Sequence, residues 1–432
     1  MREKAFHFGK KVLKHELIKG SFYLFIGTIL SAFFAFLINL FFARNLSKPD
    51  YGVYASLIAL ITLFTIPAQS LTPIIIRFAG EYHTKGEEEK LKKFYLKMNK
   101  LLFIVAIAIL AAFLIFSSLI ENFLKLDNFL YIPMSGLIIA ISYIAIVNTG
   151  FLQGQLKFLY ISITQISGSI IRIIAGIILI FMGYRVFGAI WASILSFFIV
   201  YLLGFFPLKF LFKKTKDIDV KVPTNELAKY AVPSTIAILS LSSFISIDVV
   251  MVKHFFTPFE AGLYGGLSLI GKVIFYFTGP IPNVMFPLLI KRITKNEPYN
   301  KLFFMSMLLV LIPSVLISAF YFLFPAFAVK FFLGTGYLGV SRYIGLFGIY
   351  IAVFSLLNLC VNFFLSLRKT LIFIPLLIGS LLQIILISFF HTNFLEVILI
   401  SLTICSLLLI GFLIYYITKS KKLLAPKIDG NF

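Results

Sequence analysis

Long runs of apolar residues set the strongest constraint on what this chain can fold into. Twelve such runs, each about 20 or more residues long, occupy most of the 432-residue sequence. A lone segment in the hydrocarbon core of a bilayer can satisfy its backbone hydrogen bonds only by forming a helix. The sequence therefore predicts an all-α integral membrane protein with about twelve transmembrane helices.

The runs form two sets of six, separated by the Lys-rich segment 209–229. The first set covers residues 20–43, 52–79, 101–120, 131–153, 159–182 and 187–208, and the second covers 230–252, 262–290, 302–325, 343–366, 371–390 and 395–416. We therefore predict an N-terminal lobe over residues 1–215 and a C-terminal lobe over residues 216–432, with segment 209–229 as their linker.

Composition supports the bilayer as the solvent of this chain. Hydrophobic residues make up 60% and charged residues 13%, whereas soluble domains have about 45–50% and about 25%. A single soluble core stops growing near about 250–300 residues, so it cannot absorb this excess. The net charge of +22 favours anionic lipid headgroups as partners over nucleic acid, because no soluble domain is present to offer a basic face.

The distribution of Lys and Arg predicts the orientation in the membrane. With both termini in the cytoplasm, 29 of the 39 basic residues fall in cytoplasmic segments and 7 in external ones, which leaves Arg77, Arg172 and Lys272 inside spans. Cytoplasmic loops carry this excess in polytopic membrane proteins. We expect a multi-pass protein of the cell membrane with both termini inside.

An internal repeat is indicated by similar residues 210 positions apart. The segment Ser47–Tyr54 matches Thr257–Tyr264 in its hydroxyl, acidic, Gly and Tyr positions, and Asn148 matches Asn358 at the same offset. A hydroxyl followed three residues later by an acid is a capping box, so the match has a local explanation as well. Six spans per half would give both halves the same orientation, as in transporters built from parallel repeats.

The same segments resemble a known family. Ala43–Ser47 and Asp50–Tyr54 are similar to the first external loop of the polysaccharide-biosynthesis flippases, and Asp248 with Gly262–Tyr264 is similar to its counterpart in the second half. These flippases are the O-antigen-flippase-like branch of the multidrug/oligosaccharidyl-lipid/polysaccharide exporter superfamily. The resemblance implies two six-helix lobes around a central cavity. The chain lacks the two extra helices usual in the lipid II flippase branch.

The substrate implied by the resemblance is a polyprenyl-diphosphate-linked oligosaccharide, moved from the cytoplasmic to the outer leaflet. The expected partners are this lipid and membrane lipids, with glycan-assembly enzymes as further candidates. A cation-coupled multidrug antiporter of the same superfamily is the alternative, and a non-transporting scaffold is a third class. A glycan polymerase or ligase would need a sizeable external loop, which the chain does not offer.

Basic residues inside spans are the candidate substrate-binding groups. An ionisable group at the bilayer centre costs about 2.5–3.5 kcal/mol on insertion scales, so it usually faces a cavity or a partner. Arg172 lies mid-span on a face with Gly168 and Gly176, and Lys272 lies about ten residues into its span. Together with Arg77 and Arg44 they are predicted to hold the diphosphate. A structural Arg bonded to helix carbonyls is the alternative for Arg172.

Asp248 is the candidate ion-coupling residue, because it is an acid that falls within a predicted span. It follows Ser240, Ser243 and Ser246 and could pair with Lys272 or Lys253, or bind a proton or cation. No catalytic constellation, metal-ligand spacing or cofactor motif is found in the sequence, so we expect a transporter without a cofactor rather than an enzyme.

Prolines are predicted to bend the second span of each half. Pro67 and Pro73 interrupt the span at 52–79, and Pro280, Pro282 and Pro287 interrupt the span at 262–290. Proline removes a helix hydrogen bond and kinks the helix. Bends at comparable positions in both halves suggest hinges for alternating access, with static kinks as the other interpretation.

Overall fold

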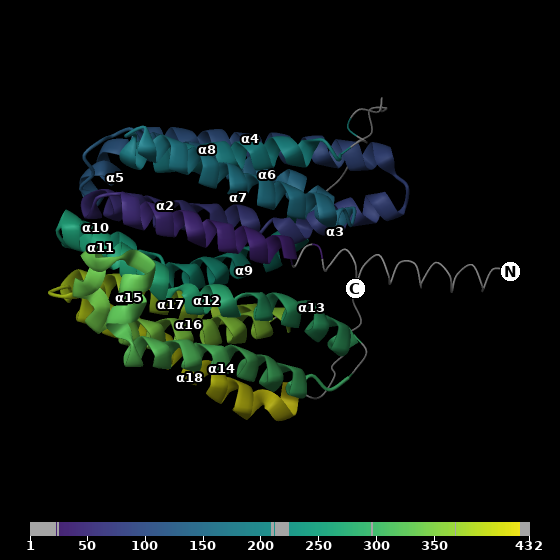
Figure 1. Ribbon diagram of the computed structural model, residues 1–432. Coiled ribbons are helices and arrows are strands. Elements are labelled where there is room, and N and C mark those ends of the chain that lie inside the picture. Colours follow the sequence, from purple (N-terminus) through teal and green to yellow (C-terminus); the bar gives the residue numbers. More distant parts are fainter. Residues whose placement is uncertain are drawn as a thin grey trace. The chain divides into compact units, whose positions relative to one another are not determined.

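The regular secondary structure of the protein is helical wherever the computed structural model describes it, at residues 23, 26–208, 211, 224–294, 297–367 and 369–423 (Figure 1). Eleven helices of this part are long and apolar enough to cross a membrane. The bent pair Val232–Phe244 and Ile247–Phe255 brings the number to twelve if it counts as one span. The prediction of an all-α membrane protein with about twelve spans is confirmed.

The chain divides into two compact units. Unit 1 comprises Met1–Asp50 and Phe64–Ala228, and unit 2 comprises Tyr51–Leu63 and Lys229–Phe432. The predicted lobe boundary between residues 215 and 216 lies outside the described residues, as do most of the predicted linker and the basic segment 1–19. The first turns of the second span belong to unit 2, which a division of the sequence into consecutive halves does not anticipate.

Unit 1 is a helical bundle arranged around α6. Its helices are Ile26–Asn45, α2 (Lys48–Gln69, in part), α3 (Thr72–Thr84), α4 (Glu88–Ile115), α5 (Ser117–Leu124), α6 (Tyr131–Gly154), α7 (Phe158–Phe181) and α8 (Arg185–Phe205). Helix α6 contacts α3, α4, α5, α7 and α8. Its polar Asn148 is buried and satisfied, because it accepts a hydrogen bond from the Tyr95 hydroxyl at 2.7 Å and donates one to the Tyr201 carbonyl at 2.9 Å.

Unit 2 is a second bundle, arranged around α16. Its helices are α9 (Thr224–Phe244), α10 (Ile247–Phe255), α11 (Pro258–Gly271), α12 (Val273–Thr278), α13 (Pro280–Thr294), α14 (Asn300–Leu323), α15 (Pro325–Leu333), η2 (Thr335–Val340), α16 (Ser341–Ser366), η3 (Thr370–Ile372), α17 (Phe373–Phe389) and α18 (Phe394–Leu423). Helix α16 contacts α11 to α15 and α18, and its centre is lined by buried Phe, Leu, Ile and Gly residues.

Corresponding helices of the two units begin 210 residues apart at two places: α2 at Lys48 and α11 at Pro258, and α6 at Tyr131 and α16 at Ser341. The predicted capping chemistry is confirmed at the first pair. The Ser47 hydroxyl accepts a hydrogen bond from the Asp50 amide, and Thr257 with Glu260 forms a fully reciprocal capping box. Whether the two halves superpose stays a prediction.

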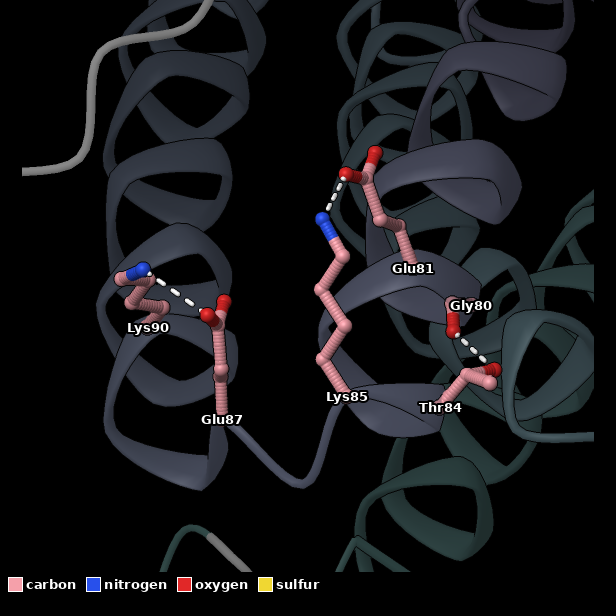
Figure 2. Close-up of polar contacts among 6 residues, drawn as sticks. All are labelled: Gly80, Glu81, Thr84, Lys85, Glu87 and Lys90. Carbon is pink, nitrogen blue, oxygen red and sulfur yellow. Dashed lines mark hydrogen bonds and ion pairs between the residues drawn. The ribbon is translucent and has the colours of Figure 1, made fainter.

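Residues 80–100, which lie between two of the predicted spans, are mostly helical. Helix α3 continues to Thr84 and α4 begins at Glu88, so the connection is only a few residues long (Figure 2). An ion pair lies on each side of this turn. Lys85 Nζ is 2.6 Å from Glu81 Oε1 at the end of α3, and Lys90 Nζ is 3.0 Å from Glu87 Oε1 at the start of α4. The start of α4 is amphipathic, and a search for apolar runs overlooks amphipathic helices that leave the bilayer.

Helix breaks occur close to some of the predicted prolines, before Pro73 in the first half and before Pro280 in the second, whereas Pro67 lies inside α2 and Pro282 and Pro287 lie inside α13. Helix α2 runs through Pro67 and ends at Gln69, and α3 starts at Thr72. In the second half, α12 ends before Gly279 and Pro280. A further junction lies at Lys272, between α11 and α12.

Candidate functional site

A break in the seventh span creates the main polar cluster of unit 2. Helix α9 ends at Phe244 and α10 starts at Ile247, and the two helices meet at an angle of 49°. Three serines precede and occupy the break, and all are buried: Ser240, Ser243 and Ser246. A helix break leaves carbonyls at one end and N–H groups at the other without intrahelical partners.

The carbonyl of Phe244, at the end of α9, receives its hydrogen bonds from two other helices. The Tyr350 hydroxyl of α16 donates to it, and Gln383 Nε2 of α17 donates at 3.1 Å. The same Gln383 nitrogen lies 2.8 Å from the Ser401 hydroxyl of α18. Four helices are thereby joined at the break.

Gln383 has an acceptor left over. Its side chain is fully buried, and among the described residues no hydrogen-bond donor reaches its Oε1 atom. A buried acceptor without a donor costs about 1–3 kcal/mol. Gln383 Oε1 could therefore accept a hydrogen bond from a bound molecule or coordinate a bound cation.

Asp248 lies in the first turn of α10, where the free N–H groups and the helix dipole favour a negative charge. It is fully buried. Its Oδ1 accepts a hydrogen bond from the Val249 amide at 2.8 Å, and its Oδ2 accepts one from the Tyr264 hydroxyl at 3.0 Å. Both donors are neutral. A buried carboxylate with neutral donors is costly when ionised, which suits it to bind and release a proton or a cation.

Lys272 is the cation that acts on Asp248. It stands at the junction of α11 and α12, is half-buried, and interacts electrostatically with Asp248. The described residues include no direct ion pair between these two side chains. The structure thus brings together two of the predicted site residues, one acidic and one basic, inside unit 2.

Arg172 lies in unit 1 on the face of α7 that the sequence indicated. Gly168 packs against Val200 of α8, and Gly176 packs against Phe42 of helix Ile26–Asn45. Ser169, one turn before Arg172, lies 2.6 Å from Ser31 of that same helix. The small, polar face is therefore a packing face within the bundle, and Arg172 is half-buried on it.

Arg77 and Arg44 are exposed and far apart along the chain. Arg77 lies on α3 with its guanidinium 5.9 Å from the centre of the Phe78 ring, and Arg44 lies at the end of helix Ile26–Asn45. The whole length of α2 separates them in sequence. Within unit 1 the predicted basic residues thus come from three different helices.

An ion pair in unit 1 was missed by the sequence analysis. Arg185, at the start of α8, donates to Asp50 Oδ2 from Nε at 2.9 Å and from Nη2 at 2.8 Å, and the Ser47 hydroxyl donates to the same oxygen at 2.6 Å. Arg185 had been assigned only to an external segment. Its proximity to Asp50 gave no signal, because 135 residues separate the two in sequence.

The chain matches a known family over most of its first two thirds. Residues 17–292 match the family model described as polysaccharide biosynthesis protein. The chain belongs to that family. It is also 27% identical over 304 residues to an uncharacterized membrane protein of Methanocaldococcus jannaschii, which covers 66% of this chain and 70% of the relative.

Solved structures show that this polysaccharide biosynthesis protein has the fold of membrane transporters. A multidrug resistance MATE family transporter of the MOP superfamily, in an inward-facing conformation, matches with a TM-score of 0.72 and 12% identity over 91% of this chain and 95% of that one. The lipid II flippase MurJ, in an inward closed conformation, matches with a TM-score of 0.67 and 16% identity over 94% of this chain and 89% of that one. At such identities the likeness concerns the fold alone.

Proposed function

We propose that this protein moves a polyprenyl-diphosphate-linked oligosaccharide from the cytoplasmic to the outer leaflet of the cell membrane. Membership of the polysaccharide biosynthesis family supports a glycan substrate. The fold shared with a lipid II flippase supports a lipid-linked one. The excess of basic over acidic residues supports an anionic headgroup.

The observation that carries the proposal is Lys272, a cation at a helix junction inside a span, coupled to the buried Asp248. A diphosphate cannot cross hydrocarbon without compensation, because burying an unpaired anion costs many kcal/mol. An ammonium group at this depth offers charge-assisted hydrogen bonds where water is scarce. We propose that three arginines form similar charge-assisted hydrogen bonds with the diphosphate at other depths in the membrane: Arg172, Arg77 and Arg44. With the binding groups distributed in this way, no single position binds the headgroup too tightly to release it.

Asp248 is proposed as the coupling residue. Proton or cation binding at its carboxylate would change how strongly Lys272 is held, and so how strongly Lys272 attracts the diphosphate. The open Oε1 of Gln383 and the hydroxyl of Tyr350 are the groups that would complete a cation site at the same break.

A cation-coupled multidrug antiporter is the second candidate. It is favoured by the buried Asp248, since a buried acid is what a cation-binding site requires, and by the fold shared with a MATE transporter. In an antiporter, however, the positively charged Lys272 would repel a cationic drug, and this argues against the second candidate.

Deletion of the gene separates the two functions. The flippase predicts loss of surface glycan with accumulation of the lipid-linked precursor, measured by a lipidomic profile, and restoration by the wild-type gene and by Lys272→Arg more than by Lys272→Gln. Unchanged glycan with raised drug sensitivity would instead establish the antiporter. A scaffold predicts that Lys272→Gln restores glycan as well as the wild type does.

A further inference from the structure

The first four turns of α4 carry several lysines that the proposed transport cycle does not use. Lys90, Lys92, Lys93, Lys97 and Lys100 all lie there, and no acidic residue follows in the sequence until Glu121. The acids of this region are instead gathered at Glu81 and residues 87–89. These acidic residues, which we call the acidic tip (Glu81 and residues 87–89), therefore lie at or before the start of the helix, and the lysines follow them along α4.

Part of the acidic tip is paired with nearby lysines. Lys85 is bound to Glu81 and Lys90 to Glu87 (Figure 2). The hydrogen bond to the Glu81 carboxylate raises the pKa of Lys85. Lys97 and Lys100 lie further along α4, next to the apolar part of the helix.

The lysines follow the face of α4 that points away from the bundle. Leu96 is 50% exposed, and further along the same face Phe103, Ile104 and Ile107 are 52%, 56% and 52% exposed. Lys97 and Lys100 are exposed and Lys93 is half-buried on this face. The opposite face packs into unit 1 through Leu91, Phe94, Tyr95, Met98 and Leu102.

The position along the helix matches the headgroup layer of a bilayer. Lys97 and Lys100 are separated by about 5 Å along the axis, and the headgroup layer on each side of the hydrocarbon core is about 5–8 Å thick. Apolar residues begin at Leu101, directly after Lys100. Lysine stems can lie along the apolar surface while their ammonium groups reach the headgroups.

We propose that Lys93, Lys97 and Lys100, together with Leu96, form a binding site for an anionic membrane lipid. The ammonium groups hold the phosphate of the headgroup. An acyl chain of the same lipid runs along Phe103, Ile104 and Ile107. The site is independent of the transported substrate and serves to fix this end of the bundle in the membrane.

Binding of phosphatidylglycerol and phosphatidylcholine to the purified full-length protein tests the proposal by native mass spectrometry. The variant K93Q/K97Q/K100Q should bind phosphatidylglycerol at least about tenfold more weakly, since each lysine near an anionic surface contributes about fivefold. K93R/K97R/K100R should bind like the wild type. The matched control K125Q/K301Q/K330Q, which removes the same charge elsewhere, should also bind like the wild type.

Two results would overturn the proposal. One is equal weakening in K93Q/K97Q/K100Q and K125Q/K301Q/K330Q, which would mean that only net charge matters. The other is equal affinity of the wild type for the two lipids. Melting temperatures measured without added lipid show whether each variant is folded, and the arginine variant tests the site even if the glutamine variant is unstable.

Discussion

Two buried acids stand at the start of helices in this protein, and their surroundings differ. Asp50, in the first turn of α2, is 6% exposed, and one of its oxygens accepts hydrogen bonds from Ser47 and from two nitrogens of Arg185. Asp248, in the first turn of α10, is 0% exposed and accepts from the neutral Tyr264 hydroxyl and the Val249 amide.

The difference is consistent with a structural role for Asp50 and with the coupling role that we propose for Asp248. The Arg185 guanidinium and the Ser47 hydroxyl contact the same oxygen of Asp50 and fix this carboxylate in place. Asp248 has only neutral hydrogen-bond donors, and Lys272 acts on it at longer range. The charge on such a carboxylate depends strongly on any ion that binds beside it and on the position of nearby charged side chains. Asp50 therefore joins α2 to α8, whereas Asp248 is free to take part in coupling.

Replacing Asp248 by Asn should have the largest effect. We expect transport in proteoliposomes to fall at least about 100-fold, which corresponds to about 2.7 kcal/mol. Transport should also lose its dependence on an imposed proton or sodium gradient, because the variant lacks the carboxylate proposed to bind the coupling ion. Asp50→Asn is the matched control and should stay within about threefold of the wild type. Gradient dependence that survives in Asp248→Asn would contradict the assignment.

Neutralising the basic groups should have the next largest effect. Lys272→Gln and Lys272→Ala should lower the flipping rate about tenfold or more, because a charge-assisted hydrogen bond contributes about 1.5–3 kcal/mol. Lys272→Arg should lose less. Arg172 should be replaced by Lys, Gln and Ala in the same way, and the flipping rates of all variants should be compared at protein levels matched by immunoblot. If Gln works as well as the native residue at both positions, these groups are structural.

The Gln383 side chain sharpens the comparison at the break itself. Gln383→Met removes both hydrogen bonds donated by Nε2 and should lower the free energy of unfolding by about 1–3 kcal/mol. It should also weaken the response of transport to the ion gradient, because the open Oε1 is lost. Ser401→Ala, which removes a neighbour but keeps Oε1, is the control; an equal loss of ion response in both variants would argue against Oε1 as a ligand.

The Asp50–Arg185 pair should show the smallest effect. The Arg185 side chain is 67% exposed, and pairs open to solvent contribute about 0.2–1 kcal/mol. A double-mutant cycle with Asp50→Asn and Arg185→Gln, followed by thermal unfolding, should give a coupling energy in this range that declines with added salt. A coupling energy above about 3 kcal/mol would mean that the Asp50–Arg185 pair behaves like a buried ion pair, contrary to this prediction.

Hydropathy alone predicted most of the fold, because the bilayer imposes the length and apolar character of each span. The run at 131–153 became α6, Tyr131–Gly154, and the run at 371–390 became η3 and α17, from Thr370 to Phe389. The start of α4 was missed since its lysines interrupt the apolar signal while preserving a helical face. Segment Tyr51–Leu63 belongs to unit 2 although it lies early in the sequence, because local sequence does not reveal packing partners.

The candidate site was predicted in part. Asp248 and Lys272 were identified as charges inside spans, and Lys272, one of the two lysines considered as partners, acts electrostatically on Asp248. Gln383, Tyr350 and Ser401 were not singled out, because neutral polar residues are common in membrane helices and only the break beside Phe244 gives them a role. The break itself carries no proline, so local sequence gave no warning of it.

The most direct test of the central claim is reconstituted flipping of matched lipids. Proteoliposomes containing the wild-type protein would receive a fluorescent oligosaccharide linked to a polyprenyl chain either through a diphosphate or through an uncharged ether, and access of an external quencher would report translocation. We predict that the diphosphate-linked glycan is flipped and that the uncharged one is not, and that Lys272→Gln lowers the flipping rate of the diphosphate-linked glycan about tenfold or more. Equal flipping of the two lipids, or flipping of neither while a cationic drug is transported, would contradict it.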